Sequence, residues 1–150
     1  MQTFLPYEDF TKSAQSLDYR RLGKQRVETL QLLAALFGEK QGWRNHPAAK
    51  MWEGSEYWLV VYGLQICSEW TDRGYKDTCA EKIDSYRQKA LQQGKTQYPS
   101  WLGDEAFHRS HRANLVRKNY EYYSPQFLDI GDDDVDMEYI WPRNNFDKAA

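Results

Sequence analysis

The sequence predicts an all-α fold, a single compact domain of several packed helices with an extended N-terminal segment and an acidic C-terminal loop. Apolar residues recur at helical spacing along almost the whole chain, and no run alternates apolar with polar residues. No Asn-Gly or Asp-Gly pair is present to mark a hairpin. The length of 150 residues, with 41% hydrophobic and 28% charged residues, predicts one domain over residues 1–150 with a proper core.

The first half of the chain is expected to contain three helices after a short extended start. Residues 8–16 predict a brief helix. Asp18 is predicted to cap a second helix over residues 19–37, which Gly38 ends. The core-facing residues of that second helix are predicted to be Val27, Leu30, Ala34 and Phe37. A third, short helix is expected to start at His46-Pro47, because proline suits the first turn.

The second half of the chain predicts three more helices. Residues 55–72 are apolar on more than one face, which is typical of a central, buried helix. Asp77 or Thr78 is expected to cap a mostly polar helix that reaches about residue 93. A last helix is predicted from about Asp104 to Lys118.

Charge is distributed unevenly along the chain. The formal net charge is −2, but residues 1–118 carry +4 and residues 119–150 carry −6. A basic body suits a polyanionic partner. The acidic segment 129–138 lacks the ligand spacing of a calcium loop. It is interpreted either as a solvated loop or as a segment that lies against the basic surface and competes with nucleic acid.

Other features exclude several classes of protein. No apolar run approaches the length of a membrane span, and the first residues do not resemble a signal peptide, so we expect a cytoplasmic protein with no membrane partner. The two cysteines, Cys67 and Cys79, fit no zinc pattern and are expected to be reduced thiols. We expect no cofactor and a monomer.

Residues 18–28 form the first cluster that could carry chemistry. On a helix, Arg20 and Lys24 share one face, while Arg21 and Glu28 lie about two turns apart on another. One interpretation is a solvated face with a single contact between an arginine and Glu28. The other is a phosphate clamp with a carboxylate placed for acid–base work at a sugar.

The second cluster lies in the last predicted helix. Glu105, His108 and His111 are three residues apart and could together bind a metal ion. Arg109 and Arg112 beside them disfavour a divalent cation and suit phosphate or base contacts instead. An ordinary amphipathic helix buried through its apolar residues is the third interpretation.

The order of motifs in the chain resembles the pyrimidine dimer DNA glycosylase family. The resemblance covers about residues 1–142 and depends on the segments 3–7, 17–28, 46–48, 51–54, 69–70, 73–78, 99–105 and 108–112. It implies an all-α base-excision glycosylase and abasic-site lyase that acts on double-stranded DNA. In this family the N-terminal amine attacks the sugar C1′, the base leaves, and the resulting imine permits strand cleavage by β-elimination.

The resemblance also implies site residues. The nucleophile would be the amine of Met1, because the bulky Gln2 hinders removal of Met1. Arg20 and Arg26 match the phosphate-binding arginines of the family, whereas Arg21 occupies the position of its catalytic glutamate. Asp18, Glu28 and Glu105 are the candidates for the carboxylate, and Glu28 is chosen because it follows the cationic stretch on the same helix.

The residues predicted to contact DNA are Arg20, Arg21, Lys24, Gln25, Arg26, Arg44, His46, His108, Arg109, His111, Arg112, Arg117 and Lys118. Two alternatives remain: a DNA-binding or base-modification accessory protein on the same scaffold, and a metal-dependent nuclease that uses Glu105, His108 and His111.

Overall fold

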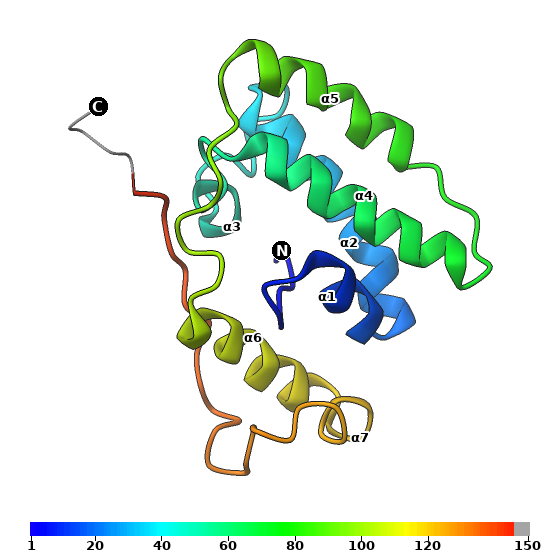
Figure 1. The fold of residues 1–150 in the computed structure, drawn as a ribbon, viewed down its shortest axis with the longest axis vertical. Coiled ribbons are helices and arrows are strands. Elements are labelled where there is room, and N and C mark those ends of the chain that lie inside the picture. The colour runs from blue at the N-terminus through cyan, green and yellow to red at the C-terminus, as the bar shows by residue number, and fades with distance from the viewer. Residues whose placement is uncertain (146–150) are drawn as a thin grey trace.

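The computed structural model describes residues 1–145, and this part of the chain contains seven helices and no strand, which confirms the all-α prediction (Figure 1). In chain order the helices are α1 (Phe10–Ser16), α2 (Tyr19–Leu36), α3 (Pro47–Lys50), α4 (Glu56–Asp72), α5 (Ala80–Gln92), α6 (Glu105–Lys118) and α7 (Tyr120–Tyr123). Six of them lie where the sequence predicts a helix. The short α7 was not predicted.

Polar residues begin the main helices largely as predicted. Asp18 and Asp104 each accept a hydrogen bond from a backbone N–H in the first turn of α2 and α6. Asp77 accepts from two backbone N–H groups at the start of α5, at 3.1 and 2.8 Å. Gly38 follows α2 with a φ of +79°, which side-chain-bearing residues rarely adopt.

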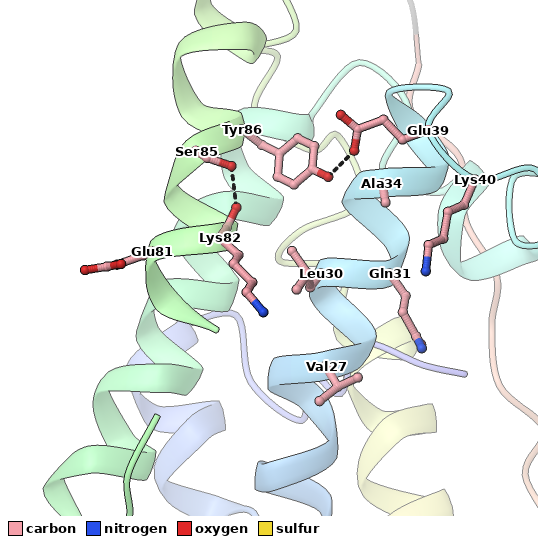
Figure 2. Close-up of a pocket in the computed structure, with 10 residues that line it drawn as sticks. All are labelled: Val27, Leu30, Gln31, Ala34, Glu39, Lys40, Glu81, Lys82, Ser85 and Tyr86. Carbon is pink, nitrogen blue, oxygen red and sulfur yellow. Dashed lines mark hydrogen bonds between the residues drawn. The ribbon is translucent and has the colours of Figure 1, made fainter. Parts of the chain in front are cut away.

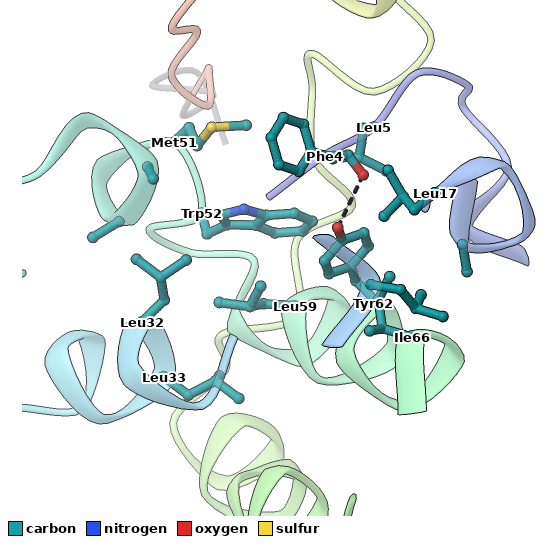
Figure 3. Packing of buried hydrophobic residues seen from close by; sticks show 14 of the residues in the cluster. Phe4, Leu5, Leu17, Leu32, Leu33, Met51, Trp52, Leu59, Tyr62 and Ile66 are labelled. Atoms are coloured by element: carbon teal, nitrogen blue, oxygen red, sulfur yellow. Dashed lines mark hydrogen bonds between the residues drawn. The ribbon is translucent and has the colours of Figure 1, made fainter. Parts of the chain in front are cut away.

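Helix α4 is the central helix, as its apolar profile predicts. It packs against α1, α2 and α5. The aromatic centre of the core includes Trp52 and Tyr62, which are fully buried with their ring centroids 6.0 Å apart (Figure 3). In the same view the Tyr62 hydroxyl donates a hydrogen bond of 2.9 Å to the carbonyl oxygen of Phe4. The core therefore extends from α4 to the N-terminal segment.

The predicted core face of α2 is partly wrong. Val27 is 44% exposed, and Leu30 is only half-buried. The residues of α2 that the fold buries are Leu22, Gln25, Thr29, Leu32, Leu33, Ala34, Ala35 and Leu36. The reason lies in the tertiary structure. One face of α2 packs against α4 and the N-terminal segment, and the face beside α5 is less covered.

The N-terminal segment is extended and runs between α6 and the layer formed by α2 and α4 (Figure 1). Its backbone is bonded on both sides. Phe4 N–H donates to Gln25 Oε1 of α2 at 2.9 Å, and Leu5 N–H donates to His111 Nδ1 of α6 at 2.9 Å. His108 Nδ1 lies 2.8 Å from the Leu5 carbonyl oxygen. Residues 2–6 are consequently buried although they lie at the start of the chain.

The acidic segment 129–138 lies against the basic side chains of α6. Asp129 pairs with Arg112 at 2.8 Å, and Asp134 pairs with Arg109 at 3.0 Å. Arg117 donates to the Val135 carbonyl oxygen at 2.7 Å. The segment is therefore held by ion pairs, and its competition with nucleic acid stays a prediction.

The described residues 1–145 include seven helices and both cysteines. None of the helices there has the length and apolar character needed to cross a membrane. Cys67 and Cys79 are both buried and unbridged.

Candidate functional site

A cavity of about 560 Å³ lies where the N-terminal segment, the first turns of α2 and the end of α6 meet. Its lining combines the first residues of the chain with one carboxylate, four cations and two aromatic rings. The lining residues are Met1, Gln2, Phe4, Arg20, Arg21, Lys24, Glu28, Lys118 and Tyr139.

The basic side chains of this cavity, together with the N-terminus of α2, suit it to an anion. The first turn of α2 brings the positive end of a helix dipole to the cavity, together with Arg20 and Arg21. Helix α6 ends at Lys118, a basic residue at the negative end of its dipole. Four cations thus come from two helices that are far apart in the sequence.

Glu28 lies directly beside the start of the chain. Its Oε2 atom accepts hydrogen bonds from the Gln2 backbone N–H and from Gln25 Nε2, both at 3.2 Å. Met1, Glu28 and Arg20, three residues predicted to carry the chemistry, line the same cavity. A carboxylate is therefore held one residue from the chain start.

The four cations differ in their surroundings. Arg20 and Lys24 are exposed, whereas Arg21 pairs with Asp18 at 3.1 Å. Lys118 is exposed as well, but partial desolvation lowers its pKa, and the nearby charges of Arg21, Arg117 and Lys24 lower it further. A second hollow of about 450 Å³ shares Arg20, Arg21 and Lys118 with the first, so the cationic surface continues past the cavity.

Tyr139 and Phe4 supply the aromatic walls, and sequence reasoning gave neither a site role. Their ring centroids are 6.5 Å apart. Burial raises the pKa of Tyr139 to about 12, so its phenol stays protonated at neutral pH. No local pattern could have placed Tyr139 beside α2, because the two meet only in the tertiary structure.

Two of the predicted DNA contacts lie around the loop that precedes α3. Arg44 donates to the Ala35 and Leu36 carbonyl oxygens at the end of α2, at 3.4 and 3.2 Å. His46 caps α3 through Nδ1, which accepts from Ala48 N–H at 3.0 Å. Neither side chain lines the cavity.

The charges of two cavity residues, Met1 and Glu28, nevertheless affect the pKa of His46. Burial lowers its pKa, the Met1 ammonium lowers it further, and the Glu28 carboxylate opposes both. The indole rings of Trp43 and Trp141 meet the His46 ring edge-on, with centroids 5.6 and 5.8 Å away.

Arg26 and Gln25 do not have the exposed, DNA-facing positions that were predicted. Arg26 pairs with Asp77 at 2.7 Å and lies over the Trp70 ring, with its Cζ 4.4 Å from the ring centroid. Gln25 is 1% exposed. Both side chains contact protein because α2 is covered by α4 and the N-terminal segment on these faces.

The buried residues of α6 also correct the prediction of DNA contacts there. His108, His111 and Arg112 are 2%, 0% and 6% exposed. Both histidines bond the backbone of Leu5, and Arg112 Nη1 donates to the Pro6 carbonyl oxygen at 2.9 Å. These side chains hold the N-terminal segment, and almost none of their surface is exposed in this fold.

Arg109 and Arg117 occupy a different position on α6. Arg109 is partly accessible and Arg117 is exposed, and both bind the acidic segment 129–138. Their contact with DNA stays a prediction.

The metal-site alternative has no support in the arrangement of its three residues. Glu105 pairs with Arg112, and both nitrogens of His108 face backbone groups, with Nε2 accepting from Gly103 N–H at 2.9 Å. Among residues 1–145, no three His, Cys, Asp or Glu side chains form a group that could hold a metal ion.

A larger cavity, of about 680 Å³, lies between α2 and α5 (Figure 2). Val27, Leu30 and Ala34 form its apolar wall on α2. Its charged residues are two glutamates and two lysines, and one of them, Glu39, accepts a hydrogen bond from Tyr86. This balanced lining has no preference for an anion, so the smaller cavity is the better candidate site.

The fold and the site define an all-α protein whose cationic cavity suits a phosphate-bearing ligand and contains both the chain start and a carboxylate. The sequence model of the pyrimidine dimer DNA glycosylase family matches residues 1–83, more than half of the chain, and the protein belongs to this family. Membership indicates DNA repair glycosylase activity with DNA as the substrate. Neither the curated proteins nor the solved structures contain a significant match to the chain.

Proposed function

We propose that the protein is a base-excision DNA glycosylase and abasic-site lyase that works through its N-terminal amine. The observation that carries this proposal is the meeting of Met1, Glu28 and Arg20 in one cavity, with Glu28 Oε2 3.2 Å from the Gln2 nitrogen. The family match supports a glycosylase, and the cationic lining supports a phosphate-bearing substrate.

The reaction uses the lone pair of the neutral Met1 amine. The amine nitrogen forms a bond to the sugar C1′, and the glycosidic bond breaks, so that its electron pair leaves with the base. Opening of the sugar ring then leaves an imine between the amine and C1′. Loss of a proton from C2′ and departure of the 3′ phosphate complete β-elimination and cleave the strand.

Glu28 is assigned two tasks in this scheme. A carboxylate beside C1′ stabilises the positive charge that develops on the sugar as the base leaves. The same group can move protons during imine formation and ring opening. Arg20, Arg21, Lys24 and Lys118 would hold the phosphates on either side of the reacting nucleotide.

The test is covalent trapping of the imine. The protein is incubated with a duplex that carries either an abasic site or a pyrimidine dimer, in the presence of borohydride, and the adduct is mapped by peptide mass spectrometry. We expect the adduct on the N-terminal peptide, and acetylation of the N-terminus should abolish it. An adduct on Lys118, whose pKa is lowered and which lines the same cavity, would contradict the assignment of Met1.

Glu28→Gln tests the carboxylate. We expect turnover to fall by about 10²–10⁴-fold with little change in DNA affinity, because the change removes acid–base capacity and keeps the size of the side chain. Glu81→Gln on α5, outside the cavity, is the matched control and should leave turnover unchanged. Full activity of Glu28→Gln would refute its role.

A second function has one observation in its favour, which is that Arg21 stands where the family has its catalytic glutamate. If the protein binds DNA but forms no adduct with any damaged duplex, a DNA-binding or base-modification accessory role replaces the glycosylase proposal.

A further inference from the structure

The buried amide of Gln25 joins the N-terminal segment to Glu28. It is 1% exposed, and its polar atoms all have partners. Oε1 accepts from Phe4 N–H at 2.9 Å and from the Tyr62 hydroxyl at 2.6 Å. Nε2 donates to the Gln2 carbonyl oxygen at 2.8 Å and to Glu28 Oε2 at 3.2 Å.

This arrangement replaces a missing β-strand partner. An extended segment needs partners for its backbone N–H and C=O groups, and no strand is present among residues 1–145 to supply them. The Gln25 amide bonds the Gln2 carbonyl oxygen and the Phe4 N–H, as a neighbouring strand would. The backbone of residues 2 and 4 is therefore held at a fixed position along the axis of α2.

Tyr62 holds the amide in one orientation. Its single hydroxyl hydrogen is shared between two acceptors, Gln25 Oε1 at 2.6 Å and the Phe4 carbonyl oxygen at 2.9 Å, so the amide must present its oxygen and not its NH₂ group to Tyr62. Rotation of the amide by half a turn would place Nε2 against the Phe4 N–H, which is itself a donor. The same rotation would place Oε1 against the Gln2 carbonyl oxygen and the Glu28 carboxylate. The network thus allows only one orientation.

We propose that Gln25 is a positioning residue, which sets the distance between the Met1 amine and the Glu28 carboxylate. Its one side-chain amide bonds both the backbone of residues 2 and 4 and the Glu28 carboxylate. The proposal rests on the proposed function, because it assumes that this amine and this carboxylate act together. Gln25 is too deeply buried to contact substrate, so it acts only through its neighbours.

Two variants remove different parts of the network. Gln25→Glu keeps an acceptor for Phe4 N–H but loses the donor to Gln2 and Glu28, and it adds a negative charge beside Glu28. Gln25→Met keeps the approximate volume and removes every hydrogen bond. Gln31→Met is the matched control, since Gln31 lies on the same helix but lines the cavity beside α5.

Three measurements are made on the full chain at a temperature where circular dichroism shows each variant folded. They are the rate of borohydride trapping on an abasic duplex across pH, the Kd for a duplex with a non-reactive tetrahydrofuran abasic analogue, and the rate at which acetic anhydride acylates the N-terminal amine without DNA. We expect Gln25→Met to slow trapping by about 10²-fold, the effect of a misplacement of about 1 Å, with Kd unchanged within about twofold. We expect the trapping and acylation profiles of Gln25→Glu to move to higher pH, because an added carboxylate favours the charged ammonium.

The outcomes separate this proposal from the proposed function. Normal trapping and acylation by folded Gln25→Met would overturn the positioning role. Parallel losses in trapping rate and DNA affinity, without a shifted pH profile in Gln25→Glu, would also overturn it, because that pattern indicates general structural damage. If the wild-type protein forms no adduct on Met1, the proposed function fails, whereas the acylation profiles still decide whether Gln25 positions the amine.

Discussion

Acid should lower the free energy of unfolding, because the buried His111 resists the protonation that an unfolded histidine accepts. This imidazole is fully buried, and its Nδ1 accepts the hydrogen bond from Leu5 N–H at 2.9 Å. Burial lowers the pKa of His111 to about 3, and the neighbouring His108 adds to the effect. Protonated Nδ1 cannot accept from Leu5, so the charged form loses this bond in addition to its hydration.

The sign and size follow from proton linkage. An unfolded histidine has a pKa of about 6.5, so between that pH and about 3 the unfolded state binds a proton that the folded state does not. The contribution to the free energy of unfolding is complete above pH 6.5 and is lost as the pH falls. The loss is about 1.4 kcal/mol per pH unit, or about 2.7 kcal/mol at pH 4.5. Burial also lowers the pKa of His108, which adds a loss of the same sign.

The assay is urea unfolding followed by tryptophan fluorescence at pH 7.5, 6.5, 5.5 and 4.5. His111→Asn is the reference variant, because its amide oxygen can accept from Leu5 N–H but does not titrate. We expect the free energy of unfolding of the variant to fall less steeply as the pH is lowered. The difference between the two slopes should correspond to one proton bound on unfolding. Equal slopes for the two proteins, or an NMR titration of His111 near pH 6.5, would refute the reasoning.

Three further predictions concern DNA binding and packing. Arg20→Ala should reduce the slope of log Kd against log salt concentration by about one unit. Arg26→Ala should leave that slope unchanged, because Arg26 is paired with Asp77. Equal changes of slope in the two variants would contradict the assigned DNA-contact surface. Gly63→Ala should destabilise the protein by about 1–3 kcal/mol, because its Cβ would lie 2.6 Å from Thr29 Cγ2; a thermal melt within error of wild type would refute this. Replacing the exposed aspartates at 132, 133 and 136 by asparagine should tighten DNA binding at low salt if the acidic segment competes with DNA, and an unchanged Kd would leave it a structural connector.

The helices follow from local chemistry, which is why the sequence predicts them well. Asp18 and Asp104 cap α2 and α6 within their own first turns, and Gly38 follows α2 in a conformation that glycine favours. The apolar profile of residues 55–72 likewise identifies the central helix α4 without knowledge of its neighbours. Each of these signals acts over a few residues, so it can be read along the chain.

The members of the candidate site could be predicted only in part. The cationic start of α2 and Glu28 are visible as a pattern with helical spacing, and the family resemblance directs attention to Met1. The sequence did not show which residues of α2 face the interior of the protein. Gln25 and Arg26 look like members of the same basic stretch as Arg20, yet they turn toward protein.

Packing of the helices against the N-terminal segment determines which polar side chains face the cavity and which hold the chain in place. His111 and Gln25 read as candidate DNA contacts in the sequence, but packing of the N-terminal segment between α2 and α6 makes both of them its hydrogen-bond partners. Tyr139 reaches the cavity from the opposite end of the chain. The sequence determined the helices and the residue types, because helical propensity and capping are local. Burial depends on contacts between segments that are 21 residues apart for Phe4 and Gln25 and 106 apart for Leu5 and His111, which no local pattern contains.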